Sequence, residues 1–123
     1  MDIAAELEKI SALDKKEDIG PLPVRGLAEI LEQHGDWLES NGAAGIQANF
    51  SRENLEGADL IDSRLQDAIL NKTILKRADL MLADLRGASL LQANLREANL
   101  LGAMFQQANL QAAESRIVQS RAL

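Results

Sequence analysis

Large apolar residues recur at every fifth position along more than half of the chain. The series has thirteen members: Phe50, Leu55, Leu60, Leu65, Leu70, Leu75, Leu80, Leu85, Leu90, Leu95, Leu100, Phe105 and Leu110. Alanine stands two residues before most of them, and only Glu53, Ser63 and Thr73 replace it. A helix, with a period of 3.6 residues, or a strand, with a period of two, would not bring this series to one face. The pattern instead predicts a chain that turns a corner every five residues.

Four sides of five residues close one coil of about 20 residues, and successive coils stack at about 4.8 Å, the spacing of adjacent strands. The large residue and the alanine two before it then point inward, as the alternation of side chains requires. Thirteen pentapeptides give just over three coils. Because the terminal coils of such a rod expose core residues and unpaired backbone, we expect both ends to be covered.

The repeat unit resembles the signature of a known family. The tripeptides that carry the resemblance are Ala78-Asp79-Leu80, Ala83-Asp84-Leu85, Ala93-Asn94-Leu95, Ala98-Asn99-Leu100 and Ala108-Asn109-Leu110. They are similar to the A(D/N)Lxx motif of pentapeptide-repeat proteins, and the resemblance covers residues 46–113. It implies a mainly β fold, a right-handed quadrilateral β-helix.

Two helical patterns precede the repeats. Ile3, Leu7 and Ile10 form one stripe of a first helix that should end before the proline-containing segment 20–23. A second helix is expected from about Leu27 to Ser40, because Asn41-Gly42 supplies a stop signal. We expect this second helix to cover the first coil as an N-terminal cap that includes Leu31, His34, Trp37 and Leu38.

The chain therefore divides into three parts: an acidic helical segment and cap (residues 1–45), a pentapeptide-repeat β-helix (46–113), and a short C-terminal cap or tail (114–123). The tail has few large apolar residues, namely Ile117, Val118 and Leu123. Such a thin cover leaves the last coil partly open. Contact between the rod ends of two copies is accordingly one route to a homodimer.

Charge is concentrated before the repeats. The net charge is -6; residues 1–45 hold ten acidic and four basic residues, whereas residues 46–113 hold eight and seven. A nearly neutral rod in a chain with one Trp, two Phe and no Tyr offers nucleic acid neither a positive surface nor a stacking platform. No stretch reaches the roughly 20 apolar residues of a membrane span, and no apolar signal core is present. We expect no nucleic-acid or membrane partner, and a cytoplasmic location.

The residue types needed for catalysis or metal binding are scarce. Cysteine is absent and His34 is the single histidine, so no second imidazole can complete a metal site or a catalytic pair. We expect His34 to have a packing or capping role. Asp59, Asp79 and Asn99 stack at intervals of 20 and could hold a cation, but Asp or Asn at this position also suits hydrogen bonding to the corner backbone. We favour the structural role and expect no enzyme activity, metal or cofactor.

One line of outward positions is apolar where polar residues are the norm. Ile61, Met81 and Leu101 follow one another at intervals of 20, and Leu82 lies beside Met81. We call these four residues the apolar stripe. The predicted first helix could fold back over the stripe, or a protein partner or a second copy could bind there.

These observations favour a non-catalytic protein–protein interaction or scaffold module whose partner the sequence does not identify. The family resemblance implies an alternative, since some members mimic duplex DNA and bind type II topoisomerases, protecting them from inhibitors. Those rods are long and acidic and dimerise through a hydrophobic C-terminal segment, whereas this rod is short and nearly neutral. A third hypothesis is a structural spacer in a larger assembly.

Overall fold

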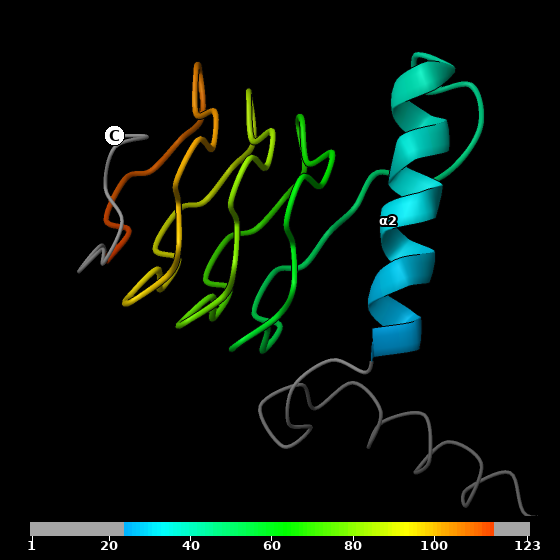
Figure 1. Cartoon of the computed structure of the whole chain (residues 1–123). Coiled ribbons are helices and arrows are strands. Elements are labelled where there is room, and N and C mark those ends of the chain that lie inside the picture. Colours follow the sequence, from blue (N-terminus) through cyan, green and yellow to red (C-terminus); the bar gives the residue numbers. More distant parts are fainter. Residues whose placement is uncertain (1–23, 115–123) are drawn as a thin grey trace, which may run out of the picture.

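The computed structural model describes residues 24–114, and the predicted first helix and most of the tail lie outside this range. The single helix of the described residues, α2 (Val24–Glu39), precedes a stack of coils formed by the repeats. It lies across one end of the stack, and the coils follow in chain order away from it (Figure 1). The helix begins three residues before the predicted Leu27 and ends one residue before the predicted Ser40.

Parallel β-bridges join residues that are 20 positions apart. The first coil pairs with the second through one bridge on each side, namely Asn49 with Ile69, Asn54 with Ile74, Asp59 with Asp79, and Arg64 with Asp84. One coil therefore contains four pentapeptides, as the period predicts. Within residues 24–114 the bridges are isolated and no extended strand forms, so the β structure of the coils consists of single parallel bridges. Two of every five residues form a corner, which leaves each side too short for a regular strand.

The corners explain why the repeat prefers Asp or Asn before each leucine. At each one the chain makes a β-turn, for example with Ala78 N–H donating to Leu75 O at 3.0 Å. The residue before the alanine has a positive φ, as Arg77 does at 60°, which is the signature of a type II turn. The side chain of Asp79 accepts the N–H of Met81 at 3.2 Å, and Asn94 does the same for Arg96 at 3.1 Å.

The fivefold series lines the axis of the stack. Its eleven members from Phe50 to Leu100 are 0–2% exposed, while Phe105 and Leu110 in the last coil are half-buried against them. Each buried leucine contributes about 1.5–3 kcal/mol. The hydroxyl groups that replace alanine are satisfied, because Ser63 donates to Leu60 O and Thr73 to Phe50 O, both at 2.7 Å.

Gly35→Ala should raise the free energy of unfolding by about 0.5–1 kcal/mol, because a glycine inside a helix costs this much relative to alanine. The added Cβ would meet only the Arg64 guanidinium, at 3.7 Å, which is ordinary contact. Urea unfolding followed by circular dichroism measures the change. A decrease would show that Arg64 does not tolerate the methyl group.

Candidate functional site

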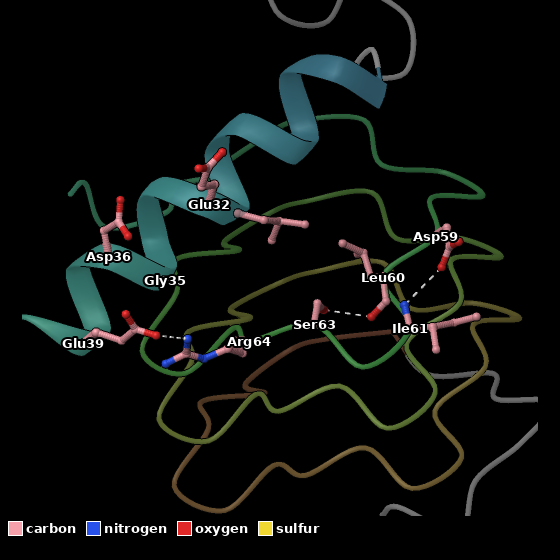
Figure 2. A pocket seen from close by; sticks show the side chains of 10 residues that line it. Glu32, Gly35, Asp36, Glu39, Asp59, Leu60, Ile61, Ser63 and Arg64 are labelled. Carbon is pink, nitrogen blue, oxygen red and sulfur yellow. Dashed lines mark hydrogen bonds and ion pairs between the residues drawn. The ribbon is translucent and has the colours of Figure 1, made fainter.

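A groove of about 470 Å³ separates α2 from the first coil. Its helix wall consists of Leu31, Glu32, Gly35, Asp36 and Glu39, and its coil wall consists of Asp59, Leu60, Ile61, Ser63 and Arg64 (Figure 2). Glu32, Asp36 and Glu39 share one helix face because they are spaced by four and three residues. The groove therefore has acidic side chains on both walls and apolar side chains between them.

The charges of the groove are only partly compensated. Arg64 Nη1 lies 2.8 Å from Glu39 Oε1 and joins the two walls, as Figure 2 shows. The carboxylates of Glu32 and Asp36 make no ion pair or hydrogen bond with any residue of the described range 24–114. With four carboxylates and one guanidinium, the groove is a negatively charged surface.

His34 ties α2 to the first coil. Its ring is fully buried, and Nδ1 accepts the backbone N–H of Ala48 at 2.9 Å, while Nε2 lies 2.8 Å from the carbonyl oxygen of Gln66. Because a backbone N–H can only donate, Nδ1 carries no proton, and Nε2–H donates to Gln66. Both ring nitrogens of the single histidine are thus engaged by backbone groups.

Burial lowers the pKa of His34 below its ordinary value of 6.5. The hydrogen bond to Gln66 and the charge of Asp67 act in the opposite direction, and the charge of Arg64 adds to the lowering. Protonation would also place a second donor at Nδ1, facing the Ala48 N–H. The neutral ring is therefore the form that fits this position.

The other predicted cap residues have different surroundings. Leu31 packs against the core, together with Leu27 and Ile30. Trp37 stacks on His34 with 5.4 Å between ring centroids, and Leu38 is half-buried beside Asp67 at a separate small pocket. Trp37 and Leu38 are not among the residues packed on the core, so the described cover over the first coil is made by Leu27, Ile30, Leu31 and His34.

The apolar stripe is open to solvent along the described coils. Ile61, Leu82 and Leu101 are 42%, 53% and 37% exposed, and Met81 is half-buried. The side chain of Leu82 lies over Gly102 of the next coil. A Cβ added to Gly102 would sit 2.7 Å from Cδ2 of Leu82. Ile61 also lines the groove, so the stripe and the groove form one continuous surface. The predicted cover by the first helix concerns residues outside the described range.

Two features were missed by the sequence analysis. The groove is one, although carboxylates at positions 32, 36 and 39 of a predicted helix were a visible signal. The other is a two-bond ion pair in which Arg86 donates from Nε and Nη2 to Asp84 at 2.8 and 2.6 Å. This pairing lowers the pKa of the nearly buried Asp84 carboxyl. The available hint was the spacing of Asp84 and Arg86, because side chains two residues apart in an extended segment point to the same face.

Stacked coils of four pentapeptides, with an inward leucine and an Asp or Asn before it, define a class of repeat protein. A family model described as pentapeptide repeats (8 copies) matches the chain twice, over residues 46–77 and 78–113. The chain belongs to the pentapeptide-repeat family. Members of this family typically serve as interaction or structural modules.

Solved structures of the same family are similar to the chain. A pentapeptide repeat protein from the thylakoid lumen of Arabidopsis thaliana is 31% identical with a TM-score of 0.55, over 57% of this chain and 49% of that one. HetL, a protein of Nostoc sp. involved in heterocyst differentiation regulation, is 28% identical with a TM-score of 0.37, over 66% of this chain and 44% of that one. The chain thus spans about half the length of these relatives.

No curated protein is similar enough to the chain to be matched. Among residues 24–114, no helix is both long and apolar enough to cross a membrane.

Proposed function

We propose that the protein is a non-catalytic interaction module that binds a partner protein through the apolar stripe. The observation that carries the proposal is the exposure of large aliphatic side chains on three consecutive coils, at corners where polar residues are the norm. Burying this surface against a partner would remove an unfavourable contact with water. A second copy of the chain is one such partner.

Leu82 is the most exposed residue of the stripe, at 53%. This residue has a φ of 61°, a left-handed conformation that is uncommon for leucine and costs about 1–2 kcal/mol. The equivalent corners of the neighbouring coils hold Asp62 and Gly102, which adopt it more readily. The same corner is left-handed at Lys72 and Arg77 as well, so the conformation follows from the turn, and what sets Leu82 apart is a large apolar side chain exposed to solvent.

The same proposal takes the rod as the right-handed quadrilateral β-helix that the family resemblance implies. The 20-residue register of the bridges supports four sides per coil, and it holds the stripe residues of successive coils in line. A cytoplasmic location is also part of the proposal, supported by the absence of cysteine. Since the similar Arabidopsis protein comes from the thylakoid lumen, localisation of a tagged chain in its own cell is the relevant measurement.

The hydrogen bonds of His34 support a non-catalytic role. His34 uses both ring nitrogens for backbone groups, so it is not available as a general base. Within the described part of the chain, no three His, Cys, Asp or Glu side chains are grouped so that they could hold a metal ion.

The double variant Ile61→Glu/Leu101→Glu should lose its partner while it keeps its fold, because two charges would have to be buried in an apolar contact. Capture from a lysate of the source organism, quantified by mass spectrometry, should show at least a tenfold loss of that partner. The control Gln92→Glu/Ala112→Glu adds the same charges at exposed corners two sides away. Equal capture by both variants would contradict the proposal, and sedimentation of the pure protein detects a second copy as the partner.

A further inference from the structure

We infer that the groove between α2 and the first coil accepts a partner segment in which lysine or arginine side chains lie next to aliphatic ones. This inference rests on the proposed function, because it specifies the chemistry of the partner that binds at the α2 end of the apolar stripe. It follows from the charges of the groove, from the sequence of α2 and from the apolar residues between the two walls.

The charge of the groove selects a cationic segment. Four carboxylates, those of Glu32, Asp36, Glu39 and Asp59, face one guanidinium, and Arg64 is already paired with Glu39 at 2.8 Å. The carboxylates of Glu32 and Asp36 make no hydrogen bond or ion pair with the described residues. An acidic segment or a nucleic-acid backbone would be repelled here, whereas a lysine or arginine side chain would meet carboxylates that have no ion pair within residues 24–114.

The sequence of α2 places these acids where they disfavour the helix. Glu32 and Asp36 are four residues apart, so their charges repel on one face. Asp36 and Glu39 lie in the last turn, which contains no basic residue, and acids there oppose the helix dipole. A bound cation would relieve both effects. An arrangement that costs stability in the free protein is expected where a partner supplies the missing charge.

The apolar part of the groove selects an aliphatic neighbour for that cation. Leu31 is half-buried and Ile61 is 42% exposed at the edge of the groove, where the stripe continues onto the next coils. Gly35 contributes no side chain and leaves space between the walls (Figure 2). A segment that alternates cationic and aliphatic side chains can therefore cover Ile61 and reach Glu32 and Asp36 at the same time.

The test uses an acetylated, amidated octapeptide of alternating lysine and leucine as the probe. Amide chemical shifts of the isotope-labelled full chain are recorded during titration, with a lysine–serine and a glutamate–leucine octapeptide as comparisons. The lysine–leucine peptide should shift the amides of groove residues such as Ile61 and Ser63. It should bind at least fivefold more tightly than either comparison, and more weakly as salt is added.

The variant Glu32→Gln/Asp36→Asn should weaken binding of the lysine–leucine peptide about fivefold. The control Glu29→Gln/Glu56→Gln removes the same charge outside the groove and should leave the affinity unchanged. Equal loss in the two variants, or equal binding of the glutamate–leucine peptide, would overturn the inference. If the Ile61→Glu/Leu101→Glu variant loses its captured partner while Glu32→Gln/Asp36→Asn retains it, the proposed function stands and this inference fails.

Discussion

Replacing Gly45 by alanine should displace α2 from the first coil and lower the free energy of unfolding by about 3 kcal/mol or more. Gly45 has a φ of 73° in the segment that returns from α2 to the repeats. A Cβ added there would overlap the carbonyl oxygen of Gln33 and lie 2.5 Å from the backbone nitrogen of Trp37. Backbone strain and overpacking each cost about 1–3 kcal/mol, and the helix backbone cannot rotate away as a side chain could.

Gly57→Ala is the matched control for this substitution. Gly57 has a similar φ of 69°, but an added Cβ would meet nothing within 4 Å. Its expected cost is the conformational one alone, about 1–2 kcal/mol. Urea unfolding gives both free energies, and the emission of Trp37, the single tryptophan, reports on the position of α2. Equal losses in the two variants would show that the contact between Gly45 and the helix is unimportant.

Prediction from sequence succeeds for the repeats and for α2. A repeat of fixed period specifies the same local geometry thirteen times, so the core from Phe50 to Leu100 and the four-sided coil follow from the period alone. The amphipathic pattern around Leu27 and Leu31 likewise predicts α2 and the side that it buries. These are local or strictly periodic signals, and they do not depend on how separate elements meet.

The groove depends on how separate elements meet, and this is why the sequence did not predict it. Its width is set by contacts of high sequence separation, such as those of His34 with Gln66 and of Gly45 with Gln33. Trp37 stacks on His34 of the same helix, three residues earlier, and is not among the residues packed on the core. Residues 24–114 contain no extended strand for a different reason: two of the five positions in each repeat form the corner, and the remaining three are too few for a regular strand.

Removing the imidazole of His34 is the second substitution with a large expected effect. His34→Leu would leave the Ala48 N–H and the Gln66 carbonyl without their partners in a buried position. Each unsatisfied group costs about 1–3 kcal/mol, so a loss of about 3 kcal/mol is expected. His34→Gln supplies an acceptor and a donor on a flexible side chain and should recover part of this loss. If His34→Leu and His34→Gln were equally stable, the two hydrogen bonds would not be the cause.

The buried imidazole of His34 also makes the free energy of unfolding depend on pH below 6.5. Because the pKa of His34 is lowered in the folded protein, the unfolded chain binds a proton more readily, and protonation favours unfolding. The contribution of the neutral ring is complete above pH 6.5 and is lost as the pH falls toward the folded-state pKa, by up to about 1.4 kcal/mol per pH unit. His34 is the only histidine, and the carboxyl groups of Asp84 and Glu97, whose pKa values are lowered by Arg86 and Arg77, respond only at more acidic pH.

Urea unfolding at pH 7 and pH 5 should therefore show a loss of unfolding free energy at pH 5 for the native chain and almost none for His34→Gln. A loss of equal size in both would assign the pH dependence to other groups and remove the neutral imidazole from the account of how α2 is held.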